Sequence, residues 1–407
     1  MNTIYIKNDK QVSGKNLLDH LRTMDLDLIA PCGGKGLCGK CMVKILMGPS
    51  VLSTPYSENE VISQEEWIKG YRLACRIEIQ EDLEVQLMET YSGRANILTD
   101  GYYSASLDPL VKKRYFQIDK PDIEDQRADT DRIESIANGI DILDIDLIKE
   151  LSYTLNRFDY KVTLAYTNDE IISIEGGDTA HDCYGLALDI GTTTIAGVLI
   201  NLNTGEELGV YSSINPQKQY GDDVISRIDY TMENKHGLKK LSSLLVQEIN
   251  RMLTYFENQY HIRKNNIYHL NLVGNTIMIH MLVGAPVGQI AASPFNPVFT
   301  RLKDVKAVEL GIDTYDKALV TSLPLSAGYI GADTLSCITA CGMAQEQELS
   351  LMIDIGTNGE IALGNQDKIV TCATAAGPAF EGGHIECGMG GVRGAINTVK
   401  VDEHGLK

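Results

Sequence analysis

The sequence is short of basic residues and of long hydrophobic runs. Its 407 residues include 36 Lys and Arg against 55 Asp and Glu, which gives a formal net charge of −19. That balance disfavours a nucleic-acid-binding protein, because such proteins normally carry a basic patch. No apolar run approaches the roughly 18 residues that span a membrane, and the first residues lack the features of a signal peptide. We therefore expect a cytoplasmic protein that binds small molecules or other proteins, and neither nucleic acid nor a membrane.

Several catalytic and metal-binding motifs are also missing. There is no Gly-Lys-Ser/Thr phosphate loop and no His-Glu-x-x-His zinc motif. The nine cysteines are an odd number, which argues against a disulfide framework. Four of them lie in the first 75 residues, where such a group indicates a metal or redox site. The other five are expected to be small buried hydrophobes, two of them on one helix face: Cys183, Cys337, Cys341, Cys372 and Cys387.

The four N-terminal cysteines have the spacing of an iron–sulfur site. Cys32, Cys38 and Cys41 form a Cys-x5-Cys-x2-Cys motif, and Cys75 follows after 33 further residues. A [2Fe–2S] cluster needs four thiolates, two for each iron. Glycines between Cys32 and Cys41 let the backbone curl around a cluster and point amide groups at its sulfurs. Zinc is the alternative, but a zinc site usually has two Cys-x2-Cys pairs and only one is present. The motif resembles the adrenodoxin-like [2Fe–2S] ferredoxins.

Four segments differ in their residue patterns. The first has short strands and small helices, which suggests a β-grasp fold. A weakly patterned linker follows it, then a small α+β middle domain, and finally a stretch in which β-branched strands alternate with helices. The boundaries are 1–93, 94–122, 123–180 and 181–407.

Local signals predict individual elements within the first and third segments. Ser13 is expected to cap a helix over residues 17–21, and Ser57–Glu60 fits a capping box that opens a helix ending at Trp67. Residues 73–79 read as a strand. Residues 133–155 are expected to be helical, followed by two strands. His280 lies in an apolar run and is expected to be a core histidine with its hydrogen bonds satisfied.

An internal repeat occurs in the last segment. The stretch from Gly185 to Ala196 contains Asp-Ile-Gly-Thr, and the same four residues recur from Asp354, 165 positions after Asp189. Each copy lies between two apolar strands, so each is expected to form a tight hairpin. Such a hairpin can offer amide and hydroxyl donors to phosphate oxygens, and its Asp can hold Mg²⁺ through water. Two hairpins facing each other could clamp a polyphosphate.

Residues 185–407 resemble the acetate and sugar kinase, heat-shock cognate and actin (ASKHA) superfamily. The resemblance implies an ATP site with Mg²⁺ in which Asp189 and Asp354 are catalytic. Asp333, on a helix expected over 328–340, would position the attacking water. Only 53 residues follow Asp354, so we expect the second half of this domain to be incomplete. The phosphate-binding residues implied by the two motifs are Gly191, Thr192, Thr193, Thr194, Gly356, Thr357, Asn358 and Gly359.

The whole chain resembles the reductive activators of corrinoid proteins that carry an N-terminal [2Fe–2S] domain. The combined resemblance predicts a multi-domain α+β and α/β protein with a β-grasp domain and an ASKHA domain. It implies ATP-dependent reduction of Co(II) to Co(I) in the corrinoid protein of a methyltransferase system, fed by a low-potential electron donor in an anaerobe. A homodimer is also implied. The alternative is a ferredoxin-type electron carrier fused to a nucleotide-binding domain that does not hydrolyse ATP.

Overall fold

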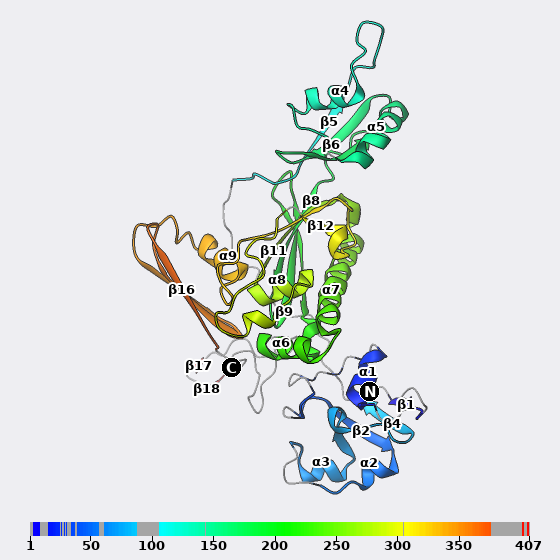
Figure 1. The fold of residues 1–407 in the computed structure, drawn as a ribbon, viewed down its shortest axis with the longest axis vertical. Coiled ribbons are helices and arrows are strands. Elements are labelled where there is room, and N and C mark those ends of the chain that lie inside the picture. Colours follow the sequence, from blue (N-terminus) through cyan, green and yellow to red (C-terminus); the bar gives the residue numbers. More distant parts are fainter. Residues whose placement is uncertain are drawn as a thin grey trace.

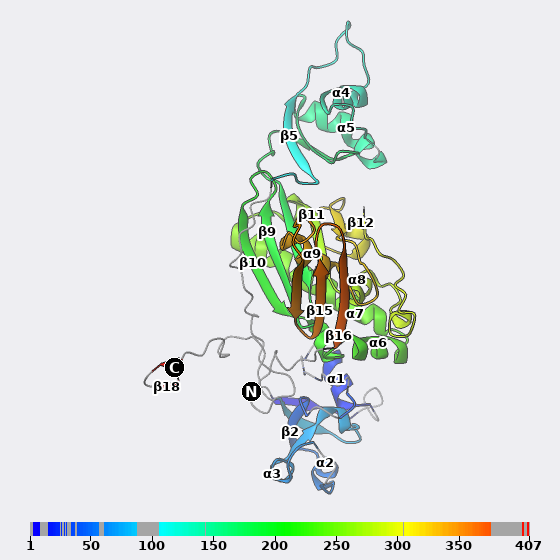
Figure 2. The ribbon, with the colours of Figure 1, turned by 90° about the vertical axis from the view of Figure 1, so that its left-hand side faces the viewer.

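The structure, a computed structural model, contains three domains arranged along one long axis (Figure 1). We call them the cluster domain, the small domain and the central domain. The small and cluster domains lie at opposite ends of the central domain (Figure 2). Among the described residues, no helix is both long enough and apolar enough to cross a membrane. The structure describes residues 3–8, 15–24, 26, 28, 30, 34–36, 39–56, 61–87, 106–142, 144–303, 305–375, 401–402 and 405–406.

The cluster domain is a four-stranded sheet with strand order β1-β4-β2-β3, and helix α1 packs against it. This arrangement confirms the predicted β-grasp fold. Leu17, Leu18 and Leu21 of α1 are fully buried in its core, because they recur at helical spacing. The elements are β1 (Thr3–Ile6), α1 (Leu17–Thr23), β2 (Met42–Met47), α2 (Pro49–Ser53), α3 (Gln64–Ile68), β3 (Tyr71–Leu73) and β4 (Leu83–Leu87).

Three local predictions in this domain need correction or lie outside the described residues. The capping box that opens α3 is Ser63 with Glu66, while Ser57–Glu60 lie outside the described residues. The side chain of Asn16 caps α1, and Ser13 also lies outside them. The strand expected over 73–79 ends at Leu73, because the chain turns there through a 3-10 helix, Ala74–Arg76.

The small domain is a three-stranded antiparallel sheet covered by two helices. Its strands are β5 (Lys112–Gln117), β6 (Lys161–Tyr166) and β7 (Ile171–Gly176), in the order β5-β6-β7. The linker expected over 94–122 is therefore wrong at its C-terminal end, since β5 belongs to this sheet. The single helix expected over 133–155 is two helices, α4 (Asp129–Ile136) and α5 (Ile145–Arg157). A turn at Asn138 and Gly139, both with positive φ, separates them.

A buried ion pair joins the small domain to the central domain. The Lys113 ammonium of β5 has no exposed side-chain surface and lies 2.8 Å from a carboxylate oxygen of Glu175 on β7. It also donates to the hydroxyl of Tyr268 in the central domain, at 3.0 Å. The Tyr268 hydroxyl in turn donates to Glu175. The three groups satisfy one another, and the Lys113 charge is held away from water, whereas the Glu175 side chain keeps 24% of its surface exposed.

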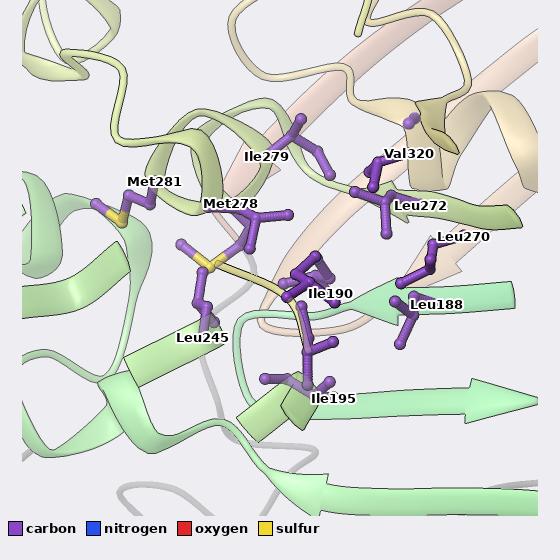
Figure 3. Packing of buried hydrophobic residues seen from close by; sticks show 14 of the residues in the cluster. Leu188, Ile190, Ile195, Leu245, Leu270, Leu272, Met278, Ile279, Met281 and Val320 are labelled. Carbon is purple, nitrogen blue, oxygen red and sulfur yellow. The ribbon is translucent and has the colours of Figure 1, made fainter. Parts of the chain in front are cut away.

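The central domain has a six-stranded sheet of order β10-β9-β8-β11-β13-β12. Strands β8, β9 and β10 are antiparallel neighbours, whereas β11 runs parallel to both β8 and β13. Helices α6, α7 and α8 bury their apolar faces in the core of this domain, where side chains of β8, β11 and α8 gather (Figure 3). The elements are β8 (Tyr184–Ile190), β9 (Thr194–Asn201), β10 (Glu207–Ile214), α6 (Val224–Glu233), α7 (Gly237–Tyr260), β11 (Ile267–Gly274), α8 (Thr276–Val283), β12 (Val305–Lys306), β13 (Leu319–Ser322) and α9 (Ala332–Ala340).

The second copy of the repeat starts a separate antiparallel sheet. Its strands are β14 (Ser350–Ile355), β15 (Asn358–Gly364) and β16 (Ile369–Ala375), in that order. Leu188 and Ile353 precede the repeated Asp in the first and second copies, yet Leu188 is 1% exposed and Ile353 is 56% exposed. The described helices that cover β8 have no counterpart on this face of β14.

Candidate functional site

Strand pairing brings two of the predicted cluster ligands together. Cys41 immediately precedes β2, and Cys75 lies in the turn that follows β3. Met42 pairs with Leu73 across these strands, which places the two sulfur atoms 3.3 Å apart. Two thiolates on one tetrahedral metal are separated by roughly 3.7 Å when each metal–sulfur bond is about 2.3 Å. Cys41 and Cys75 therefore fit a site in which both bind the same iron.

The electrostatics of Cys41 also suit a metal ligand. The pKa of its thiol is lowered to about 6, chiefly by a hydrogen bond with Cys75, although burial acts in the opposite direction. The positive charge of Arg22 lowers it further. A thiolate is the form that binds iron. The other two predicted ligands, Cys32 and Cys38, lie outside the described residues.

The loop between the cysteines uses glycine where other residues would be strained. Gly34, Gly36 and Gly39 all have positive φ, between 71° and 87°. A Cβ atom on Gly36 would lie 2.0 Å from the Nε atom of Arg76. The prediction that glycines let this loop curl is confirmed at these three positions.

The two repeated motifs form two hairpins whose turns meet. In the first, Asp189 of β8 pairs with Ala196 of β9. In the second, Asp354 of β14 pairs with Glu360 of β15. The turns of the two hairpins approach so closely that the hydroxyl oxygens of Thr193 and Thr357 are 3.0 Å apart. The structure therefore brings the two repeated motifs into contact at Thr193 and Thr357.

Three consecutive carbonyl groups of the first turn accept hydrogen bonds from neighbouring residues of the central domain. The Asn215 side chain donates to the carbonyl of Gly191 at 2.8 Å, and its backbone N–H donates to the carbonyl of Thr193, also at 2.8 Å. The fully buried guanidinium of Arg227 donates to the carbonyl of Thr192 at 2.5 Å. These hydrogen bonds fix the conformation of the turn and occupy its carbonyl groups. Backbone amides of such a turn are candidate donors to an anion.

Asn275 and Asp333 are positioned next to the first turn. The Asn275 side chain donates to the hydroxyl of Thr192 at 3.0 Å. A Cβ atom on Gly331 would lie 2.4 Å from the Cα atom of Asn275, so glycine is required for this close approach. Gly331 is the N-cap residue of α9, and Asp333 lies in the first turn of that helix. The helix was expected from residue 328, but the chain makes a tight turn there and α9 begins at Ala332.

Four carboxylates of this region repel one another. The pKa of Asp189 is raised to about 6, first because the surrounding protein removes part of the water around its carboxylate, and then because of the charges of Asp333 and Asp354. Part of the residue still contacts solvent. Partial burial, with the charges of Asp333 and Asp354, raises the pKa of Glu360 to about 7. Burial also raises the pKa of Asp333. A cation would relieve this repulsion, but among the described residues no three acidic, His or Cys side chains are close enough to chelate one directly.

Sequence reasoning missed two groups in this region. Glu360 follows directly after the predicted phosphate-binding residues and was not expected in the site, whereas its carboxylate belongs to the acidic group. Cys337 of α9 was expected in the core, but its sulfur lies 3.9 Å from a carboxylate oxygen of Asp354. Burial and the nearby carboxylates, that of Asp354 first, raise its pKa to about 11. The i, i+3/i+4 spacing of Asp333 and Cys337 on one helix was the signal that could have placed Cys337 here.

The remaining cysteines and His280 can be compared with their predictions. Cys183 is fully buried, as predicted. Cys341 and Cys372 are exposed, so the prediction that they are buried is wrong, because the part of α9 and β16 that carries them faces solvent. Cys387 lies outside the described residues. His280 is fully buried and both ring nitrogens are satisfied, Nδ1 by the carbonyl of Thr276 and Nε2 by backbone N–H groups, which confirms the core interpretation.

Four known domain families match consecutive parts of this chain. The 2Fe-2S iron-sulfur cluster binding domain matches residues 7–80 and the RACo linker region matches residues 103–181. The RACo middle region matches residues 184–346, and the C-terminal domain of RACo, the ASKHA domain, matches residues 348–407. These matches define an iron–sulfur domain fused to an ASKHA domain.

Individual relatives extend the match over almost the whole chain. The corrinoid activation enzyme RamQ of Eubacterium limosum is 30% identical over 97% of this chain and 64% of its own length. A solved structure named reductive activator for corrinoid,iron-sulfur protein is 32% identical, with a TM-score of 0.70, over 97% of this chain and 66% of its own length. The methylated amine-specific corrinoid protein reductase of Methanosarcina barkeri is 30% identical over 53% of this chain and 41% of its own length. The chain belongs to the family of corrinoid reductive activators and spans about two thirds or less of these relatives.

Proposed function

We propose that this chain is an ATP-dependent reductive activator, which returns the cobalt of a corrinoid protein from Co(II) to Co(I) by one-electron reduction. The observation that carries the proposal is the presence, in one chain, of a pair of buried cysteines fit for an iron–sulfur cluster and two facing phosphate hairpins. Relatives named for corrinoid activation match 97% of the chain. Neither part alone would support this activity.

The cluster domain would hold the electron-transfer group. Cys41 and Cys75 would bind one iron of a [2Fe–2S] cluster, and we assign Cys32 and Cys38 to the other. When bound, the cluster supplies one electron at a time. Gly34 has a φ of 87°, which favours glycine, and a Cβ atom added there would lie 3.8 Å from the Cβ atom of Cys75, so the loop packs beside this ligand.

The central domain would bind ATP with Mg²⁺ between the two hairpins. Gly191–Thr194 and Gly356–Gly359 would donate backbone and hydroxyl hydrogens to the phosphates. Asp189 and Asp354 would hold Mg²⁺ through water, and Asp333 would orient the water that attacks the terminal phosphate. With a cation in place, the repulsion that raises the pKa of Asp189 would be relieved, so the carboxylates would be ionised in the loaded site.

ATP is needed because the electron transfer is uphill. Co(I) is a very strong reductant, and each 59 mV of unfavourable potential costs about a factor of ten for a one-electron step. A gap on the order of 100–200 mV corresponds to roughly 2–5 kcal/mol. Differential binding of two conformations can supply that amount. The activator would bind the corrinoid protein most tightly in its Co(II) state and pass the electron to it. ATP hydrolysis would then reset the complex.

The partners follow from this activity. We propose the corrinoid protein of a methyltransferase system as substrate and a low-potential electron donor that reloads the cluster domain. A cytoplasmic, anaerobic setting suits both, since Co(I) reacts readily with oxidants. We also propose a homodimer built through the central domain.

Anaerobic absorption spectroscopy tests the proposal. The protein, with its cluster reconstituted, is mixed with a Co(II) corrinoid protein, a low-potential reductant and Mg²⁺ with or without ATP. Growth of the Co(I) band only with ATP is the expected result. Cluster bleaching without Co(I), whether or not ATP is present, would instead favour a tethered electron carrier whose nucleotide domain does not hydrolyse ATP. Cys75→Ser should abolish the signal, whereas the exposed Cys372→Ser should retain it.

A further inference from the structure

Arg22 makes the contact between the cluster domain and the central domain. It lies on α1, and its side chain is only 6% exposed. One of its terminal nitrogens donates to the carbonyl of Gln219, and its guanidinium carbon lies 4.5 Å from the centre of the Tyr220 ring. A second contact joins Lys35 of the cysteine loop to Asp229 of α6, with 3.6 Å between ammonium and carboxylate. Helix α1 lies close to α6 in both views (Figures 1 and 2).

The segment that Arg22 contacts is the one that holds the first phosphate hairpin. Residues 215–221 begin with Asn215, which binds the carbonyls of Gly191 and Thr193, and end with Gly221. Arg227 ties the segment together, because it donates to the carbonyl of Gly221 at 2.9 Å and to that of Thr192. Gln219 and Tyr220 lie between these two anchors. The same seven residues therefore connect the hairpin to the cluster domain.

On its other side, the helix that carries Arg22 packs in the core of the cluster domain, in which Cys41 and Cys75 are also buried. The Nε atom of Arg22 is buried and makes no hydrogen bond among the described residues. A buried cation near the cluster favours the reduced state, which carries one more negative charge. Arg22 is thus in position to respond both to the hairpin and to the cluster.

We propose that Arg22 is a positioning residue that couples the nucleotide site to the cluster domain through residues 215–221. A phosphate bound by the hairpin amides polarises their peptide groups, whose carbonyls then accept more strongly from Asn215 and Arg227. The segment is held more firmly, and the cluster domain docks more tightly. By linkage, the docked cluster domain raises the affinity for nucleotide by the same factor. The inference rests on the proposed function, because it requires nucleotide at this hairpin.

The Lys35–Asp229 pair supplies a direct readout of docking. A carbodiimide joins an ammonium and a carboxylate only when they touch, and the Lys35–Asp229 linkage is measured by mass spectrometry. In the cluster-loaded chain, the yield should rise when Mg²⁺ and a non-hydrolysable ATP analogue are added. In Arg22→Met the rise should disappear, and the analogue should bind roughly fivefold or more weakly. Lys69→Met removes one exposed charge just after α3 of the same domain and should behave like the parent chain.

Two further measurements separate docking from folding and from charge. Retention of the cluster absorption by Arg22→Met shows that its cluster domain is folded. The cluster midpoint potential should fall in Arg22→Met and stay close to the parent value in Arg22→Lys, which keeps the charge but loses the planar stacking group. Arg22→Lys should nevertheless lose most of the nucleotide-dependent cross-linking.

The possible results are distinguishable. Nucleotide binding by the parent chain without any change in cross-linking would overturn the coupling and leave the proposed function intact. A nucleotide-dependent rise that persists in Arg22→Met would do the same. If the parent chain binds no nucleotide in any state of the cluster, the proposed function and the coupling both fail.

Discussion

The hydroxyl groups of Thr193 and Thr357 lie 3.0 Å apart, although 164 positions separate the two residues in the sequence. Each hydroxyl belongs to the turn of one copy of the internal repeat. Thr357 is buried, with 8% of its surface exposed. The contact joins the turns of the two hairpins directly.

The first prediction concerns this pair. Thr357→Val keeps the shape of the side chain but removes its hydroxyl. We expect the dissociation constant for Mg²⁺–ATP to rise about tenfold or more, because a hydrogen bond to a charged group contributes roughly 1.5–3 kcal/mol. Isothermal titration calorimetry measures the change. Thr254→Val, on the outer face of α7, is the matched control, and equal affinities of the two variants would contradict the clamp.

A second prediction concerns the cluster ligands. Cys41→Ser and Cys75→Ser should each lose the cluster, because their sulfurs are close enough to share one iron. Iron content and visible absorption after anaerobic reconstitution measure this loss. Cys183→Ala and Cys372→Ser change cysteines outside the site and should keep full iron content. A Cys75→Ser protein that retains two irons per chain would refute the assignment.

The acidic group gives a pH prediction. The pKa values of Asp189, about 6, and Glu360, about 7, are raised above the ordinary values near 4. The folded chain therefore binds more protons than the unfolded chain in this range. These groups thus stabilise the fold most below about pH 4, and their contribution is lost as the pH rises toward 7.

Glu360→Gln should remove part of this dependence. Its melting temperature, without nucleotide or Mg²⁺, should exceed that of the parent chain at pH 7.5 and approach it at pH 4.5. Differential scanning calorimetry at both values makes the comparison. Glu348→Gln, at an exposed position, should follow the parent curve. A Glu360→Gln curve parallel to the parent curve would show that this carboxylate does not bind protons differently on folding.

The two hairpins could be predicted from the sequence, whereas the contacts that support them could not. The hairpins followed from a local pattern, since Asp-Ile-Gly-Thr between two apolar strands permits little else. Their meeting at Thr193 and Thr357 was a hypothesis from the repeat alone. The support by Arg227 could not be predicted, because a buried arginine reaching a carbonyl 35 positions away depends on tertiary packing. Similarly, β5 was missed because KKRYFQ has too few apolar residues to indicate a strand, and its pairing with β6 decides its structure.

The last prediction concerns Lys113 and the joint between the small and central domains. Burial alone would raise the pKa of Glu175, but hydrogen bonds from Lys113 and Tyr268 bring it below its ordinary value. Lys113→Met would leave this carboxylate buried without its cation. We expect a loss of about 3–5 kcal/mol in the free energy of unfolding, since removal of one partner of a buried pair leaves an uncompensated charge.

Urea unfolding of Lys113→Met and Lys112→Met provides the test. The Lys112 side chain is 42% exposed and pairs with Asp108 at the surface, so Lys112→Met should cost less than about 1 kcal/mol. The double variant Lys113→Met with Glu175→Gln should recover part of the loss, because a neutral amide does not need a cation. Recovery would attribute the loss to the stranded charge. Equal losses in the single and double variants would attribute it to packing around the Lys113 stem instead.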